Sequence, residues 1–473
     1  MSPPPDLGIR TLGAARIDSP LSGILDAWRT TEHYVNEHDR VLLDDTLSAA
    51  AARGVPVAEL PALEPCGPRR KIFFDPSKTR AGIVTCGGLC PGLNDVVRGV
   101  VRSLVNQYGV RRVTGFRNGY QGFIASFRHD VVELTPEVVD GITSEGGTFL
   151  GTSRGHQDAE EIVDCLERLN INVLFVVGGD GSMRGAMRIA QVAGERELRL
   201  SVVGIPKTID NDIPYIDQSF GFQTAFAQAA ETIRAVKTEA RSTPNGVGIV
   251  KLMGRHSGFI AAYAALANHD ADIVLIPEVP FELYDLLGYL HGRMAERGHV
   301  VLVVAEGAGQ DLLEDSGFIS GTDTVTDASG NAKLRDIGPF LRDRIDEHLR
   351  RAGIPPTIRY IDPSYAIRSV PANAYDKAYC LRLAHNAVHA AMSGRTEMVV
   401  GRLRRRFVHI PMALAVSRRN QVDPHGDLWM SVLEATGQPM LLSTPESEAG
   451  SESSGPSRPD SGPNHSAARS ISP

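Results

Sequence analysis

Two acidic turns in residues 172–212, each directly after a short β-branched run, constrain the fold of this chain most strongly. Residues 173–177 (VLFVV) form a continuous apolar run, which is typical of a strand buried in a parallel sheet. The run stops at the GGDGS of residues 178–182, and a helical pattern follows, so the glycines lie where a strand passes into a helix. The free N–H groups of a helix start bind anions, and Asp180 is placed to hold a divalent metal on phosphate oxygens.

The second turn repeats this arrangement. An apolar run at 200–205 leads into PKTIDND, residues 206–212. Two carboxylates beside Lys207 at a strand end indicate one general base and one group that orients it. A single GGDG is a common turn, and a single DND is as often an Asx turn. Both sequences at consecutive strand ends are more specific than either alone.

A third strand end is predicted at residues 81–84, followed by TCGGLCPGLN at 85–94. A helix is expected to begin at about Asn94, which is a good N-cap residue, with valines and leucines on its buried face. The glycine spacing does not fit G-x-G-x-x-G, which argues against a dehydrogenase.

These three junctions together resemble the phosphofructokinase family. The GG-x-x-PG-x-N of that family starts here at Gly87, and its GGT-x-LG-x-x-R element ends at Arg154. The MGR-x-SG junction is present at 253–258, and the arginines and tyrosine of the 6-phosphate pocket match Arg359, Tyr365 and Arg368. The match spans about residues 80–440. The resemblance implies an α/β fold of two doubly wound Rossmann-like lobes with the active site between them.

The expected domains follow from this match. Residues 1–75 form an N-terminal extension, with an amphipathic helix at 36–52. The nucleotide-binding lobe comprises 76–222 plus about 368–440, and the sugar-phosphate lobe 223–367. Residues 442–473 are rich in Ser, Pro, Gly and Glu and are expected to be a disordered tail. The polar segment 307–338 is expected to be a surface loop, similar to the longer family branch of plants, trypanosomes and some bacteria.

The resemblance assigns roles to residues at these junctions. Mg²⁺ and ATP are implied at the nucleotide site, with Asp180 as the metal ligand. Asp210 is the implied base toward the 1-hydroxyl of fructose 6-phosphate, with Thr208 and Asp212 as orienting groups and with Arg154 and Arg255 neutralising charge. The implied nucleotide site comprises Gly87, Tyr120, Arg154, Gly179, Asp180, Gly181 and Ser182; the implied sugar site comprises Thr208, Asp210, Asp212, Met253, Gly254, Arg255, Glu306, Arg359, Tyr365 and Arg368.

The implied activity is that of an ATP-dependent 6-phosphofructokinase. Gly181 stands where pyrophosphate-using relatives carry an acidic residue, although Lys207 is shared with them. The alternatives are a pyrophosphate-dependent phosphotransferase and a non-catalytic sugar-phosphate or nucleotide sensor. A homo-oligomer, tetramer or dimer, is implied, in which Arg359 reaches the sugar phosphate of a neighbouring subunit.

Three matters stay open at this point. Gly246 replaces a second cross-subunit arginine of the short bacterial enzymes. Arg98 and Arg102 match part of the bacterial effector site, but the accompanying basic cluster at 297–299 is thin. Use of another sugar phosphate, such as sedoheptulose 7-phosphate, is not decided by the sequence.

Charge and cysteine content exclude several other classes of function. The net charge of -7 and pI of 6.1 provide no basic field for nucleic acid or acidic membranes. Five scattered cysteines indicate reduced thiols and a cytoplasmic protein. The chain has neither a signal-peptide pattern nor an apolar run of about 18 residues, so neither export nor a membrane span is expected.

Overall fold

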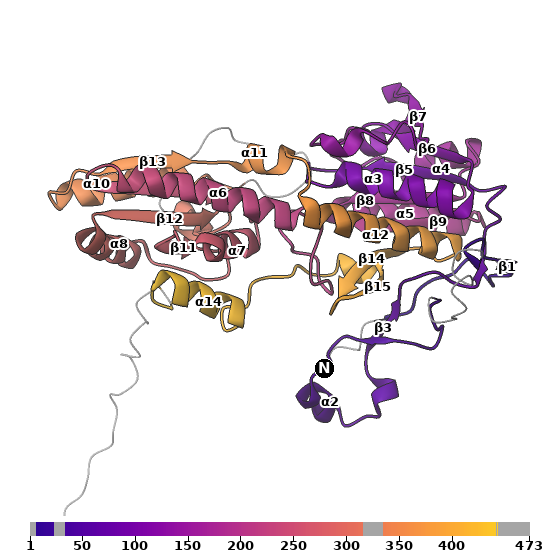
Figure 1. Ribbon diagram of the computed structural model, residues 1–473, viewed down its shortest axis with the longest axis horizontal. Helices are drawn as coiled ribbons and strands as arrows, with labels where there is room; N and C mark the ends of the chain where they lie inside the picture. The colour runs from indigo at the N-terminus through magenta and orange to yellow at the C-terminus, as the bar shows by residue number, and fades with distance from the viewer. Residues whose placement is uncertain (1–5, 23–33, 316–333, 441, 443–473) are drawn as a thin grey trace, which may run out of the picture.

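The computed structural model describes residues 6–22, 34–315, 334–440 and 442. Two α/β lobes lie side by side, one around a nine-stranded sheet and one around a four-stranded sheet (Figure 1). Within the described residues, no helix combines the length and the apolar character needed to cross a membrane.

The nine-stranded sheet has the order β2-β3-β15-β14-β9-β8-β5-β6-β7. Its central strands from β14 to β6 are parallel, and the strands outside them pair antiparallel. The strands are β2 (Val41–Leu42), β3 (Ala62–Pro65), β5 (Arg80–Thr85), β6 (Arg112–Phe116), β7 (Val131–Glu133), β8 (Val173–Gly178), β9 (Ser201–Pro206), β14 (Met398–Leu403) and β15 (Arg406–Pro411).

Helices cover both faces of this sheet, which explains the unbroken apolar runs of its central strands. Phe175 of β8 packs into a core shared with α3 (Leu93–Arg102) and α12 (Ala374–Met392). Val176, the next residue, packs into the opposite core with α4 (Ala159–Arg168), α5 (Asp180–Glu195) and α13 (Met412–Ala415). This alternation is the period of two expected for a strand.

The second lobe contains a parallel sheet of order β11-β12-β10-β13. One face packs against α6, α7 and α14, and the other against α8 and α10. The strands are β10 (Gly246–Leu252), β11 (Ile273–Leu275), β12 (His299–Ala305) and β13 (Thr357–Ile361), and the helices α6 (Phe222–Arg241), α7 (Phe259–Asn268), α8 (Leu283–Arg297), α10 (Ile337–Arg351) and α14 (Asp427–Thr436). Short elements elsewhere are β1 (Ile17–Asp18), β4 (Lys71–Ile72), α2 (Leu47–Arg53), α9 (Gln310–Asp315) and α11 (Ser364–Ser369).

The predicted helix at 36–52 is wrong. Its first half contains β2, where Val41 pairs with Leu63 of β3, and only α2 is helical. Pairing with β3 therefore overrides the helical pattern, and the N-terminal extension adds two strands to the edge of the nine-stranded sheet. The predicted surface loop at 307–338 falls partly outside the described residues.

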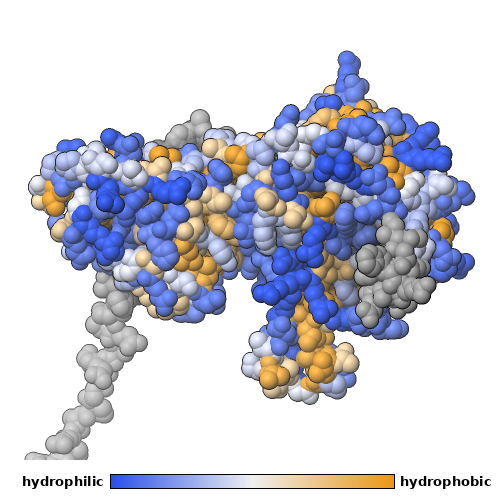
Figure 2. All heavy atoms as spheres, viewed as in Figure 1, coloured by the Kyte–Doolittle hydropathy of each residue, from blue (hydrophilic) through white to orange (hydrophobic). Residues whose placement is uncertain are grey.

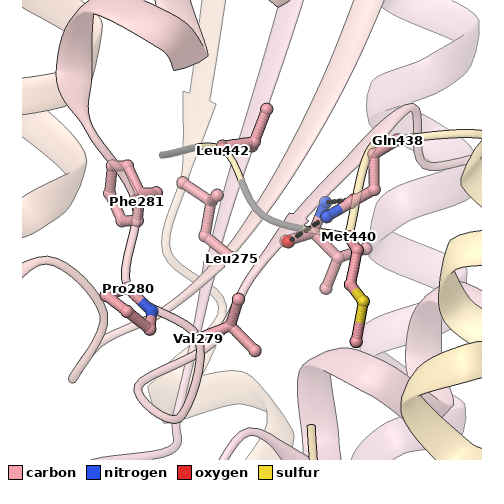
Figure 3. Close-up of a pocket in the computed structure, with 8 residues that line it drawn as sticks. Leu275, Val279, Pro280, Phe281, Gln438, Met440 and Leu442 are labelled. Carbon is pink, nitrogen blue, oxygen red and sulfur yellow. Dashed lines mark hydrogen bonds between the residues drawn. The ribbon is translucent and has the colours of Figure 1, made fainter. Parts of the chain in front are cut away.

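The assignment of residues 368–440 to the nucleotide-binding lobe needs a correction at its C-terminal end. Helix α14 packs against α7 and β11, so it belongs to the four-stranded lobe and not to the nucleotide-binding lobe. Trp429 is buried there, and the Gln438 side chain bonds both main-chain groups of Val274. Leu442 bridges to Phe281 beside the same strand, in a small apolar pocket (Figure 3). The rest of the predicted tail lies outside the described residues.

Asn94 is not the N-cap of α3 as predicted. The cap is Gly92, whose φ of 102° suits a residue without a Cβ. Asn94 lies in the first turn, where its side chain donates to the carbonyls of Ile142 and Glu145 and accepts from the amide of Phe149. Its amide thus holds the 142–149 loop against the helix start.

Candidate active site

The carboxyl ends of adjacent parallel strands define the site. Strands β5, β8 and β9 are neighbours in the large sheet, and their ends carry the three predicted turns. Strands β10, β12 and β13 are neighbours in the small sheet. Ligands of open parallel sheets bind outside such ends, so each lobe contributes one edge.

The first glycine turn is held in place by its neighbours. The carbonyl of Gly87 accepts from Thr152, its amide donates to Ser153, and its φ of 82° is in the region that favours glycine. The buried Lys207 ammonium donates to the carbonyl of Gly88 at 2.6 Å, and burial lowers the pKa of Lys207. A Cβ on Gly88 would lie 3.6 Å from the guanidinium of Arg154, so this exposed arginine faces the turn.

The second turn begins α5. Gly179 is the N-cap, and Asp180 is the first helical residue, in line with the predicted strand-to-helix junction. A Cβ on Gly181 would meet no atom within 4 Å, so the space beside Asp180 is open. Tyr120 was predicted to contact the nucleotide, but it is buried, and its hydroxyl donates to the carbonyl of Ser182. It supports the turn from behind.

The TIDND loop presents Asp210 at the centre of the site. The Thr208 hydroxyl donates to Asp212 at 2.6 Å and accepts from the amide of Asp210 at 3.2 Å. One carboxylate oxygen of Asp210 is buried without a hydrogen-bond partner. Burial, followed by the negative charges of Asp212 and Glu306, raises the pKa of Asp210 to about 8. In its ionised form, a buried carboxylate with one oxygen free of hydrogen bonds is a strong base that can take a proton from a bound ligand.

The four-stranded lobe supplies the opposite edge. The main chain of Arg255 donates a hydrogen bond to the Asp210 carboxylate, and the Ser257 hydroxyl lies 3.4 Å from the Asp210 carbonyl. Gly254 has a φ of 131°, and a Cβ there would lie 2.6 Å from the Ser257 carbonyl, so the turn requires glycine. Glu306 follows β12, and burial raises the pKa of Glu306 while Arg255 opposes that rise. Met253 is buried in the lobe's core.

The predicted 6-phosphate residues lie on β13 and on α11, the helix that follows it. Tyr365 is exposed, and the Arg368 guanidinium stacks 4.4 Å over its ring. Arg368 is close enough to Glu306 to influence its pKa. Arg359 is on β13, exposed, and 3.7 Å from Glu239. Among the described residues β13 pairs only with β10, so Arg359 lies on a free sheet edge and faces the exterior of this subunit.

Arg419 was missed by the sequence reasoning. Its guanidinium lies 3.1 Å from the Asp180 carboxylate and also pairs with Asp212. Burial raises the pKa of Asp180, and Arg419 opposes that rise. The surrounding SRRN of residues 417–420 has the composition of a solvated loop, so no motif spacing signals this role.

The structure also places the residues whose roles the sequence did not decide. Gly246 begins β10, where a Cβ would lie 1.9 Å from the carbonyl of Ala240, so no side chain fits there. Arg98 and Arg102 both pair with Asp140. His256 is exposed at the surface, although partial burial of its ring lowers its pKa, and its carbonyl accepts from Gln421.

Comparison with known proteins extends over most of the chain. A family model described as Phosphofructokinase matches residues 80–391. The chain is 60% identical over 437 residues to the ATP-dependent 6-phosphofructokinase of Amycolatopsis methanolica, covering 92% of this chain and 95% of that protein. It is 47% identical over 379 residues to ATP-dependent 6-phosphofructokinase 7 of Arabidopsis thaliana, covering 80% and 77%. The protein of that activity from Trypanosoma brucei brucei is 46% identical over 385 residues, covering 80% and 78%.

Solved structures share the fold at lower identity. A pyrophosphate-dependent phosphofructokinase from Marinobacter aquaeolei aligns with a TM-score of 0.62 at 21% identity, covering 76% of this chain and 91% of that chain. A phosphofructokinase from Saccharomyces cerevisiae aligns with a TM-score of 0.58 at 25% identity, covering 76% and 47%. The predicted fold class is thereby confirmed.

Proposed function

Because the chain belongs to the phosphofructokinase family, we propose that the site between its two sheets transfers the γ-phosphoryl group of ATP to the 1-hydroxyl of fructose 6-phosphate. The products are fructose 1,6-bisphosphate and ADP, and the enzyme is a phosphotransferase of glycolysis. The observation that carries the proposal is the position of Asp210, a buried carboxyl between the two lobes with one oxygen unpartnered.

Asp210 accepts the proton of the sugar hydroxyl as the oxygen attacks. The Thr208 hydroxyl fixes the loop through Asp212 and the amide of Asp210, so the carboxyl is held before the sugar binds. Phosphoryl transfer makes little covalent demand on the protein, and most of the acceleration comes from positioning and charge neutralisation. Arg154 on the nucleotide side and Arg255 on the sugar side supply positive charge to the transferring group.

The residues present fit a magnesium ion brought in by the nucleotide. Mg²⁺ uses one or two carboxylates together with substrate phosphates, where it neutralises the phosphate charge. Among the described residues, no group of three or more His, Cys, Asp or Glu is arranged to hold a metal. Asp180 at the start of α5, beside the open space at Gly181, fits the single carboxylate that such a site needs.

We also propose that the protein is a homo-oligomer, on the basis of two exposed features. Arg359 is oriented outward on β13, and the projecting N-terminal segment around α2 carries an apolar surface (Figure 2). Its exposed apolar side chains are Leu47, Val55 and Val57. Contact with a second copy would cover this apolar projection and would give the outward arginine a phosphate to bind, so both features support the proposed oligomer. A cytoplasmic location is also proposed, which five free cysteines support.

A coupled assay for fructose 1,6-bisphosphate tests the function. We expect turnover with ATP and fructose 6-phosphate, and little or none when pyrophosphate replaces ATP. A preference for pyrophosphate would reassign the enzyme to the other donor class. Tight binding of ATP and fructose 6-phosphate without turnover would identify a sensor instead of an enzyme. Sedoheptulose 7-phosphate in the same assay tests the sugar specificity.

A further inference from the structure

A short connector crosses the joint between the lobes. It comprises residues 417–422 and is part of the segment 416–426 that links α13 of the nine-stranded lobe to α14 of the four-stranded lobe. The amide of Asn420 donates to the Asp212 carbonyl at 2.7 Å, and the amide of Val422 donates to the Glu278 carboxylate at 2.8 Å. The same carboxylate accepts from the amide of Gly258, in the turn after Arg255. The connector is therefore fixed to both edges of the site.

Arg419 is the residue of this connector that meets the catalytic carboxylates. Its Nη2 lies 3.1 Å from Oδ2 of Asp180, and its Nη1 pairs with Oδ2 of Asp212. The Asp212 side chain is 7% exposed and that of Asp180 is 25% exposed, so the three charges interact in a partly desolvated place. One guanidinium thus serves as counterion for two carboxylates.

A divalent cation and the guanidinium cannot both be close to Asp180 without repulsion. The oxygen that accepts from Arg419 belongs to the carboxylate assigned to the metal, and like charges a few ångströms apart in a poorly solvated place repel strongly. Asp212 has a second anchor, because its Oδ1 accepts from the Thr208 hydroxyl at 2.6 Å. Arg419 can therefore leave Asp180 and remain on Asp212.

We propose that Arg419 is a positioning residue that competes with the divalent cation for Asp180. In the metal-free protein it neutralises Asp180 and Asp212 together. When the metal occupies Asp180, the guanidinium stays on Asp212 and holds the loop of Asp210 in place. This inference rests on the proposed role of Asp180 in the kinase reaction.

The test is the affinity of the nucleotide-free protein for Mn²⁺ alone, measured by the electron paramagnetic resonance signal of free Mn²⁺. Arg419→Gln should lower the Kd by about tenfold, since the competing charge is gone. Arg418→Gln is the matched control, because it removes the same charge from an exposed guanidinium that stacks 5.1 Å over Tyr215. The control should change the Kd by less than about twofold, as a solvated charge is screened.

If the Arg419→Gln substitution merely damaged the structure, Mn²⁺ would bind more weakly. Tighter binding therefore distinguishes loss of the competing charge from structural damage. An unchanged or higher Kd in Arg419→Gln overturns the inference. Arg419→Lys covers the case in which the glutamine variant does not fold. An ammonium cannot make the forked pair with two carboxylates, so this variant should also bind Mn²⁺ more tightly, by about threefold. No tightening in the folded lysine variant likewise overturns it.

The Asp180→Asn background locates the effect. In the Asp180→Asn variant, adding Arg419→Gln should no longer tighten Mn²⁺ binding. If it still does, the inference is overturned. If Asp180→Asn leaves Mn²⁺ binding of the natural protein unchanged, the metal role of Asp180 fails and the inference fails with it. The coupled assay with ATP tests the kinase reaction separately, since it depends on turnover and this titration does not.

Discussion

At the scale of single residues, the protonation of Asp210 links activity to stability. Its pKa of about 8 means that the folded protein holds a proton which an ordinary aspartate, with a pKa of 3.8, has already lost. Between these values the folded state binds more protons than the unfolded state, so stability falls as pH rises through this window. Only the ionised carboxylate can accept the sugar proton. We therefore expect kcat/KM to rise with pH over the range in which Asp210 loses its proton.

Asp210→Asn separates these two effects. The amide cannot accept the hydroxyl proton, and loss of a general base costs about 10²–10⁴ in kcat. The amide also never ionises, so the variant should melt about 2 °C or more above the natural protein at pH 8. Activity assays and thermal unfolding at pH 5 and pH 8 measure both. A variant that keeps more than about a tenth of kcat would show that another group is the base.

Gly181 tests the choice of phosphoryl donor. A Cβ at this position would meet no atom within 4 Å, and Gly181 is not among the positive-φ residues, so Gly181→Asp should leave the fold intact. Its carboxylate would lie beside Asp180, where it repels the α-phosphate of ATP. We expect kcat/KM for ATP to fall by about two orders of magnitude, at about 1.4 kcal/mol per decade.

Pyrophosphate ends before that point and should be affected less. Gly181→Asn is the control, because it adds nearly the same volume without the charge. If the Asp and Asn variants lose ATP activity equally, space and not charge decides the donor. If neither loses it, Gly181 does not select the donor.

At the scale of elements, the strands were predictable and the connector was not. Strands β8 and β9 carry unbroken apolar runs that end in glycine or proline, and such a pattern depends only on local sequence. The helix predicted at 36–52 failed because the pairing of β2 with β3 depends on distant residues. The role of Arg419 depends on where the two lobes meet, which composition and periodicity do not encode.

Strand β3 offers a test of how the N-terminal extension is held. The Glu64 side chain is 14% exposed and accepts from the buried guanidiniums of Arg69 and Arg395. Although burial alone would raise it, the pKa of Glu64 is held well below its usual range by bonds to His409 and Arg395. Glu64→Gln leaves two buried cations poorly paired, which costs about 3–5 kcal/mol. We expect the thermal midpoint to fall by about 4 °C or more at pH 7.

The pH dependence of this loss has a defined sign. Because the folded pKa of Glu64 is depressed, its contribution is present above the usual glutamate pKa of 4.5 and is lost as pH falls below it. The difference between Glu64→Gln and the natural protein should therefore shrink toward acid. Glu37→Gln is the control, since Glu37 pairs with the same arginines but its side chain is 55% exposed. Equal losses at both positions would contradict a buried anchor at Glu64.

At the scale of the whole molecule, the placement of Arg359 decides whether each site is built from one subunit or two. Arg359 is exposed on the outer strand β13, with Glu239 as its neighbour. A shared site would make Arg359→Ala and Asp210→Asn complementary in a symmetric dimer. One site of the mixed dimer then receives Asp210 from one subunit and Arg359 from the other, and the second site carries both defects.

Mixing the two variants should therefore restore activity that neither has alone. With equal amounts and free exchange, half of the dimers are mixed and each has one intact site, so we expect roughly a quarter of natural activity at limiting fructose 6-phosphate. The mixture is compared with each variant alone, and with a mixture of Asp210→Asn and Arg154→Ala, whose defects lie at the same subunit's site and should not complement. No recovery, after subunit exchange has been verified with tagged subunits, would place Arg359 at the site of its own subunit, because each subunit of the mixed dimer would then carry one defect.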